Sequence, residues 1–188
     1  MKKSFIRTFL VVLICLTLLP AASAFALRAS GSGTVRRGNF EDDGINFQVP
    51  NSFALETIET GKEADTIKLT GPKDVNGFIP RITVKIEAET YDIANIKNDE
   101  ALEYIEFELK GSNPLNLVDE IIAGENGDMR RRIFFYNTED GRMGIIYQYL
   151  MNVEEYGVIF EYEAYTATRS LPDDLAALPD LIKSFTIQ

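Results

Sequence analysis

Glu161 and Glu163 are the two residues whose type and spacing best suit catalysis in this chain. They alternate with Phe160 and Tyr162, so in a β-strand both carboxylates would point from the same face. Paired carboxylates can divide general acid and general base roles, and glycoside hydrolysis can use carboxylates alone. We favour the simpler interpretation, the more solvated face of a strand, because the chain also lacks tryptophan, a frequent sugar-stacking platform. No catalytic residue is predicted, and a carboxylate-dependent hydrolase is the alternative.

The chain contains no histidine, and its single cysteine, Cys15, lies in an apolar segment near the N-terminus. Histidine is the side chain that titrates near neutral pH and the commonest metal ligand, and the cysteine thiolate is a nucleophile and a zinc ligand. Most familiar hydrolase and zinc chemistries cannot be built without them. We therefore expect a nonenzymatic protein that carries no cofactor.

Two acidic runs, Glu41-Asp42-Asp43 and Glu139-Asp140-Gly141, could attract a hard cation. Calcium requires about six to eight oxygen ligands in a fixed arrangement. Neither run has the alternating spacing and closing glutamate of a helix-loop-helix calcium loop. We expect solvated turns and predict no metal ligand, with calcium or manganese binding as the alternative.

The N-terminal segment has the order of a secretory signal peptide. Basic residues at positions 2, 3 and 7 precede an apolar run of 11 residues, Phe9–Leu19, and small residues follow at Ala21–Ala24. That run is about half as long as the roughly 20 residues that a membrane-spanning helix needs. We expect residues 1–24 to be removed, by cleavage after Ala24 or two residues later, and Cys15 with them. The protein is then exported, periplasmic or extracellular, and does not span a membrane.

The charge balance argues against nucleic acid as a partner. The chain has 19 basic and 29 acidic residues, and removal of residues 1–24 takes three basic and no acidic ones, which leaves a net charge near −13. Nucleic-acid binding needs clustered cations that displace counterions. The one dense basic cluster, Arg130–Arg132, lies in a strand pattern, and we interpret it as a solvated strand edge or as a salt-bridge site for a partner.

The segments that would position these residues alternate apolar and polar side chains, as half-buried strands do. Apolar side chains occupy both faces of Met143–Val153, which predicts a central strand covered on both sides. Helices are expected from the N-cap Asn98 to Gly111 and from Ser170 to the C-terminus, the second broken at Pro179. The expected strands are Gly44–Pro50, Phe53–Ile58, Thr66–Thr70, Arg81–Glu89, Leu117–Ala123, Met129–Asn137, Met143–Val153 and Tyr156–Tyr165.

Seven or eight mostly antiparallel strands, with one helix midway and another at the C-terminus, predict an α+β protein. We expect an α/β/α sandwich with a mostly antiparallel central sheet. About 160 residues suit one domain with a sizeable core. Residues 25–38, with their Ser-Gly repeats, are expected to form a flexible linker, and residues 39–188 the domain.

The order of elements resembles the PsbP-like superfamily, which includes the extrinsic PsbP protein of photosystem II, Ran-binding relatives and bacterial exported DcrB-like proteins. The resemblance rests on the opening segment Asp43–Pro50, the aromatic-rich late strand Val158–Tyr165 and the closing segment Leu181–Phe185. It departs from many relatives at Phe53, where they have tryptophan, and it lacks the lipid-attachment cysteine of some bacterial members. The resemblance implies a nonenzymatic accessory or docking protein of the cell envelope.

Tyrosines are concentrated in the last hairpins of the chain. Tyrosine is enriched at interfaces because its ring is apolar while its hydroxyl can form hydrogen bonds. We predict that Tyr147, Tyr149 and Tyr162 bind an envelope or secreted protein, with packing in the core as the competing interpretation. The protein itself is expected to be a monomer.

Overall fold

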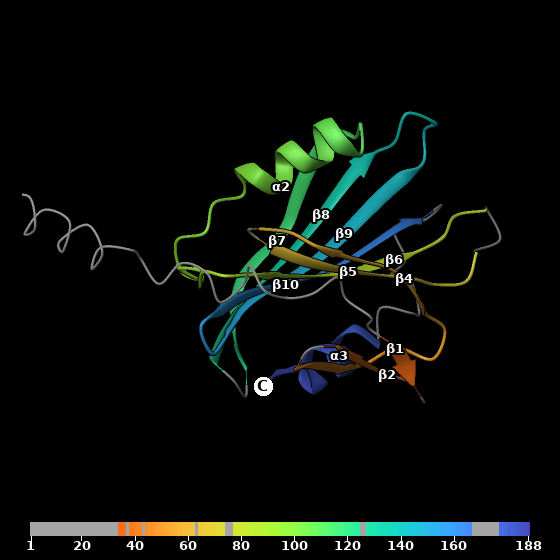
Figure 1. Ribbon diagram of the computed structural model, residues 1–188. Helices are drawn as coiled ribbons and strands as arrows, with labels where there is room; N and C mark the ends of the chain where they lie inside the picture. The colour runs from red at the N-terminus through yellow and green to blue at the C-terminus, as the bar shows by residue number, and fades with distance from the viewer. Residues whose placement is uncertain are drawn as a thin grey trace, which may run out of the picture.

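The computed structural model describes residues 34–36, 38–42, 44–62, 64–73, 77–124, 127–166 and 177–188. Its main element is a seven-stranded sheet in which all neighbouring strands are antiparallel (Figure 1). In spatial order the strands are β4 (Ala54–Thr60), β5 (Ala64–Thr70), β6 (Arg81–Glu87), β10 (Tyr156–Thr166), β9 (Met143–Val153), β8 (Gly127–Asn137) and β7 (Ser112–Gly124). A smaller antiparallel sheet has the order β1 (Thr34–Arg36), β2 (Asn39–Asp42), β3 (Ile45–Gln48) and β11 (Thr186–Ile187).

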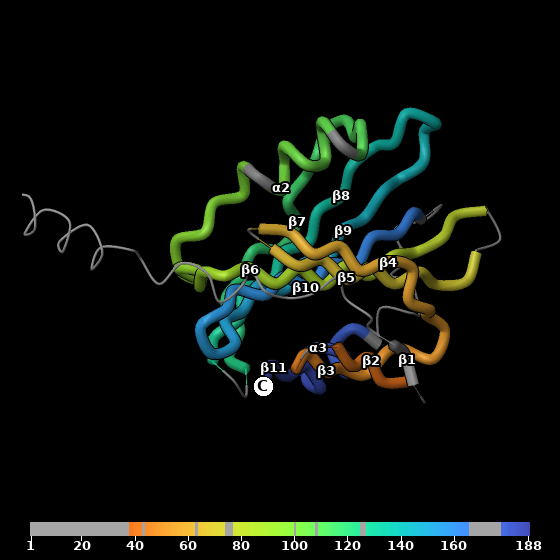
Figure 2. The backbone as a smooth tube through the Cα atoms, viewed as in Figure 1, coloured from red at the N-terminus to blue at the C-terminus, as the bar shows by residue number. Residues whose placement is uncertain are grey.

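Two layers lie on opposite sides of the large sheet (Figures 1 and 2). On one side lies α2 (Asp99–Glu103), which continues into a π-helical segment, η2 (Tyr104–Glu108). On the other side lie the small sheet and α3 (Ala177–Ser184). We call the side that carries α2 the helix face of the large sheet and the opposite side the core face.

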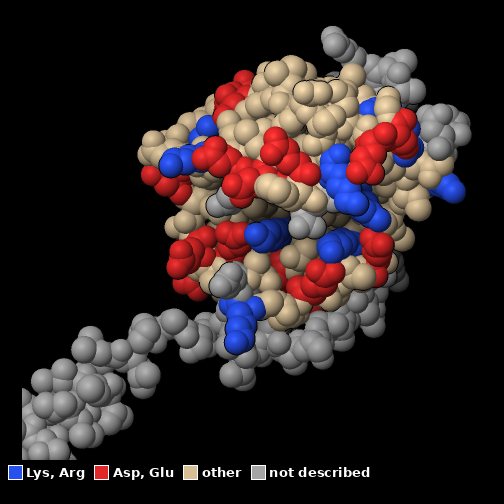
Figure 3. Space-filling view, turned by 90° about the horizontal axis from the view of Figure 1, so that it is seen from above, with Lys and Arg blue, Asp and Glu red and all other residues tan. Residues whose placement is uncertain are grey.

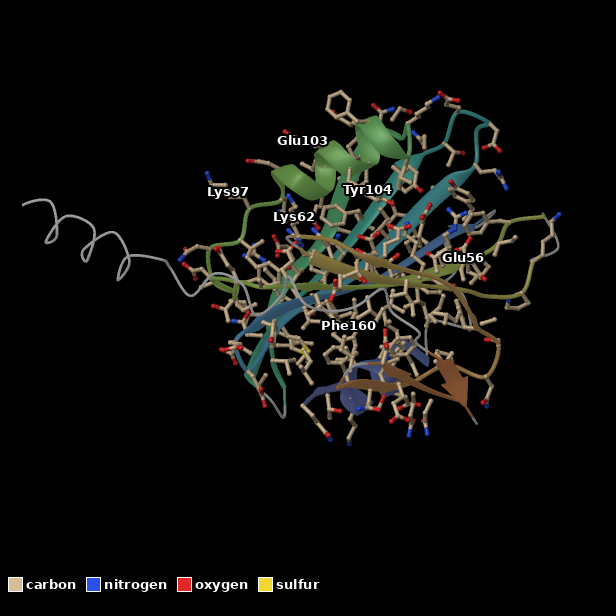
Figure 4. All side chains as sticks on the ribbon, in the orientation of Figure 1. Glu56, Lys62, Lys97, Glu103, Tyr104 and Phe160 are labelled. Atoms are coloured by element: carbon tan, nitrogen blue, oxygen red, sulfur yellow. The ribbon has the colours of Figure 1, made fainter. Side chains whose placement is uncertain are left out.

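The main core fills the space between the core face, the small sheet and α3. Along β6 the side chains of Ile82, Val84 and Ile86 are all 0% exposed, because alternate residues of a strand point to the same face. Phe160 of β10 points from the large sheet toward α3 (Figure 4). Its ring packs edge-on against Phe185, with centroids 5.1 Å apart. Burial of these apolar side chains holds the two layers together.

A second, smaller core lies under α2 on the helix face. Gly144 of β9 makes room for the ring of Tyr136, because a Cβ at Gly144 would lie 2.1 Å from the Tyr136 Cζ. Tyr104 of η2 is partly buried against this cluster. The buried members of this core are Ala101, Ile105, Phe134, Tyr136 and Ile146.

All eight predicted strands are present, and the helix predicted between Asn98 and Gly111 is present as α2 and η2. The expected α/β/α sandwich is only partly confirmed. The segment Gly44–Pro50 forms β3 of the small sheet and does not join the large one. The fold is therefore richer in sheet than predicted, since the small sheet shares with α3 the layer that was expected to be helical.

The C-terminal segment also differs from its prediction. Pro179 lies near the start of α3 and does not break it, because the first turn of a helix leaves its N–H groups without helical partners. After α3 the chain forms β11, which pairs Thr186 with Asn46 of β3. The closing segment is thus a helix followed by a strand.

The predicted signal peptide, residues 1–24, lies outside the described residues. Strand β1 falls inside the range predicted as a linker, 25–38, and pairs with β2. Sheet structure therefore begins before Asn39. Among the described residues, no helix is long and apolar enough to cross a membrane.

Candidate functional site

The Glu161 carboxylate lies on the helix face of β10, where it is partly buried. Gln148 of β9 donates a hydrogen bond from its Nε2 to Glu161 Oε2 at 2.6 Å. Burial raises the pKa of Glu161 to about 7, although the hydrogen bond from Gln148 and the cations Arg132 and Lys85 oppose the rise. A carboxyl group that titrates near neutral pH can exchange a proton under physiological conditions.

Glu163 lies two residues further along β10 and is only 6% exposed. The hydroxyl of Tyr136 donates a hydrogen bond to its Oε1 at 3.4 Å. Burial raises the pKa of Glu163, while Arg81 and the Tyr136 bond oppose the rise. The two carboxylates do share a face as predicted, but the expectation of a more solvated face is wrong, because side chains of the neighbouring strands cover both. Each has the hydrogen-bonded partner that a structural carboxylate requires.

Paired charges occupy the more open part of the helix face. Figure 3 shows basic side chains along a hollow in this face, with acidic side chains on both sides of it. Lys68 Nζ lies 2.7 Å from Glu59 Oε1, and Lys85 Nζ lies 2.5 Å from Glu87 Oε1. In each pair the two charges neutralise each other, and because the pairs are exposed they add little to the stability of the fold.

The arginine cluster is not the solvated strand edge that the sequence suggested. The edge strand is β7, and β8 lies inside the sheet. Arg130 forms two hydrogen bonds with Asp119, at 2.6 and 2.8 Å, and Arg131 pairs with Glu120. Arg132 is 4% exposed. Arg130 and Arg131 therefore form ion pairs with acidic side chains of β7 within the fold.

Arg132 also ties the chain before α2 to the sheet. Its Nη1 donates to the carbonyl of Lys97 at 2.9 Å and to Asn98 Oδ1 at 3.1 Å. Arg130 Nη1 donates to the carbonyls of Ile93 and Ala94, each at 3.3 Å. Lys97, labelled in Figure 4, lies where the chain approaches α2. These arginines position the layer that covers the helix face.

The acidic run at 139–141 forms the turn between β8 and β9. Asp140 accepts hydrogen bonds from Arg142 Nε at 2.7 Å and from Thr138 Oγ1 at 2.5 Å, and Arg142 holds the pKa of Asp140 at about 2. In the described part of the chain, no group of three acidic side chains is arranged to hold a metal ion. Asp43 of the other run lies outside that part.

Two of the three tyrosines predicted to bind a partner are core residues. Tyr147 is 4% and Tyr162 is 1% exposed, since both side chains point into the core face beneath the small sheet and α3. They can offer no contact surface in this conformation, and the packing interpretation applies to them. Tyr149 is partly exposed and lines a cavity. The partner-binding role stays a prediction for Tyr149.

The core face is left partly open over β7, β8 and the adjoining side of β9, and we call this region the apolar face. Leu115 and Leu117 of β7 are 56% and 54% exposed. The strand register aligns Leu115 with Phe135, and one polar pair, Glu120 with Arg131, crosses the region. Its apolar members are Leu115, Leu117, Val118, Ile122, Met129, Ile133, Phe135, Met143 and Tyr149.

Two cavities lie at opposite ends of the apolar face, each of about 360 Å³. The first is lined by Asn113, Leu115, Leu117, Phe135, Tyr136, Asn137 and Met143. The second, beside α3, is lined by Ile122, Ala123, Gly124, Met129, Tyr149, Met151, Pro179, Ile182 and Lys183. Exposed apolar surface of this kind marks sites where a protein or ligand binds.

No protein-family model matches the sequence, and no curated protein matches it either. The fold is similar to cyanobacterial PsbP from Synechocystis sp. PCC 6803, with a TM-score of 0.52 and 12% identity over 85% of this chain and 94% of that chain. A Pseudomonas aeruginosa protein of unknown function, PA94, is also similar, with a TM-score of 0.44 and 10% identity over 85% of this chain and 99% of that chain. The similarity to the cyanobacterial protein shows that this chain has a PsbP-like fold, as the sequence resemblance predicted.

Sequence reasoning missed most of the apolar face. The strand predicted at Leu117–Ala123 begins earlier, at Ser112, and therefore also includes Leu115. A signal for it exists, since Leu115 and Leu117 alternate with Asn116. Nothing local indicates that the leucines stay exposed, because that depends on where α3 and the small sheet end.

Proposed function

We propose that the protein is an exported, nonenzymatic docking or accessory protein of the cell envelope, and that it binds a protein partner through the apolar face. The observation that carries the proposal is the exposure of Leu115 and Leu117, 56% and 54%, next to a cavity. Leucine side chains left in water cost free energy that a partner would recover on binding. The PsbP-like fold and the missing histidine support a binding role over catalysis.

The shape of the region fits a partner that contacts both a flat strand and a pocket. Among the described strands, β7 pairs with β8 alone, so no described strand occupies its outer edge, which can form further hydrogen bonds. The first cavity, walled by Phe135 and Met143, can receive one large apolar side chain of the partner. A central apolar anchor surrounded by weaker contacts is the usual arrangement of an interface hot spot. We further propose that the protein is a monomer apart from this partner and binds no nucleic acid.

A photo-reactive phenylalanine analogue at position 117, introduced into the protein in its own cells, tests this function. We expect one discrete crosslinked product, weakened at least tenfold by Leu115→Ser in the same chain. The matched control places the analogue at Phe107, which is 74% exposed on η2 of the helix face and should give no such product. Equal products from both positions, or no product from position 117, would overturn the proposal.

A further inference from the structure

The second cavity differs from the rest of the apolar face in its charge. Among the described residues that line it, Lys183 is the one with a charged side chain, and the others are apolar except for the hydroxyl of Tyr149. The chain as a whole carries a net charge of −10. The cation beside this apolar cavity favours an anionic group over a cationic one locally, against the net negative charge of the chain.

A second cation lies next to this cavity. Arg131 is aligned with Tyr149 across the β8–β9 pair, so its side chain lies on the same face as the tyrosine that lines the cavity. Its guanidinium also pairs with Glu120. Its Nε is buried and has no hydrogen-bond partner among the described residues. Because Glu120 neutralises the charge of Arg131, the net positive charge at the cavity comes from Lys183 of α3.

The walls suit a flexible aliphatic chain. Met129 and Met151 come from the sheet and Ile182 from α3. Methionine side chains adapt to irregular apolar ligands because they are unbranched and polarizable. The volume of about 360 Å³ lies in the lower part of the range for small-molecule sites.

We propose that the second cavity binds a medium-chain carboxylate, with its aliphatic chain against Met129, Met151 and Ile182 and its carboxylate at Lys183. The chain would be removed from water by the apolar walls. A carboxylate that pairs with a cation at the edge of an apolar site gains a charge-assisted hydrogen bond. This site goes beyond the proposed docking function, and it lies on the same apolar face at the opposite end from the first cavity.

The methionine methyl groups provide the test, because they report on the two cavities separately. Methyl NMR spectra of the full chain, labelled at methionine, would be recorded while decanoate is added below its micelle concentration. We expect the signals of Met129 and Met151 to shift and that of Met143, which lines the first cavity, to stay in place. Unchanged signals at Met129 and Met151, or an equal shift at Met143, would overturn the proposal.

The role of charge is tested with the same measurement. Lys183→Glu is expected to weaken decanoate binding at least tenfold, whereas Lys62→Glu, an equal charge change at an exposed position in the turn between β4 and β5, should leave it unchanged. Decyltrimethylammonium, which carries a similar chain and the opposite charge, should bind at least tenfold more weakly than decanoate. Equal affinity for the two amphiphiles would show nonspecific apolar adsorption and would exclude a carboxylate site.

Discussion

On the apolar face Leu115 and Leu117 are 56% and 54% exposed, whereas on the helix face of the same sheet Arg132 and Glu163 are 4% and 6% exposed. Both faces are built by the same alternation along neighbouring strands. What differs is the cover above each face. The chain before α2 covers Arg132 and the side chain of Tyr136 covers Glu163, while the small sheet and α3 stop short of β7. In this sheet, therefore, some charged side chains are buried and some apolar side chains are exposed.

Buried charged side chains and exposed apolar side chains have different consequences for the protein. A charged group can remain buried only when hydrogen bonds and counter-charges replace water, and the network around Arg132 and Glu161 does this. An exposed leucine needs no hydrogen-bonded partner, and the free energy that its contact with water costs is recovered only when another apolar surface covers it. The buried charges therefore affect the stability of the fold, whereas the exposed leucines carry the proposed docking function.

The largest effect is expected from Arg132→Met, which should lower the free energy of unfolding by about 3 kcal/mol or more. It removes the donor to the Lys97 carbonyl and to Asn98 Oδ1 and takes a cation from the surroundings of Glu161. Urea denaturation measures the change, and amide exchange before α2 should become faster. Lys68→Met, which breaks an exposed pair on the same face, should cost under about 1 kcal/mol. Equal losses in both variants would show that burial does not distinguish these cations.

An intermediate effect is expected from the titration of Glu161. Its pKa is about 7 in the folded protein against 4.5 ordinarily, so the folded state holds this proton more tightly. The contribution of the group to stability is full below about pH 4.5, falls as the pH rises toward 7, and is then lost, a difference of up to about 3 kcal/mol.

Glu161→Gln should remove that decline and make the protein more stable than the unmodified chain at pH 8, because the neutral amide escapes the burial cost of a carboxylate. Denaturation midpoints between pH 4 and 8 measure the difference between the two proteins. Glu155→Gln, at the exposed turn between β9 and β10, is the control and should leave the profile unchanged. A parallel profile for Glu161→Gln and the unmodified protein would mean that the carboxyl group titrates as if exposed.

The smallest effect on stability is expected from Leu117→Ser on the apolar face. The side chain is already 54% exposed, so the free energy of unfolding should change by about 0.5 kcal/mol or less. Leu181→Ser in α3, where the leucine is 0% exposed, should cost about 3 kcal/mol or more. Thermal or urea unfolding of both variants compares the two sites. A large loss in Leu117→Ser would show that this leucine belongs to the core and would weaken the docking proposal.

Local pattern was sufficient for most of the secondary structure. Alternation of apolar and polar residues predicted every strand from β3 to β10, and the tight polar turns predicted the β8–β9–β10 meander. It also predicted that Glu161 and Glu163 share a face and that β9 is covered on both sides. These properties follow from the two-residue period of a strand, which neighbouring residues determine by themselves.

The tertiary structure decided which side of each strand meets another layer. Tyr147 and Tyr162 are core residues, Leu115 is exposed, and Arg132 is buried. These outcomes depend on where α2, α3 and the small sheet pack. The sequence alone determined the strands, the absence of histidine chemistry and the acidic character. Burial of Glu161 and exposure of the apolar face arise from contacts between segments far apart in the chain, which no local period encodes.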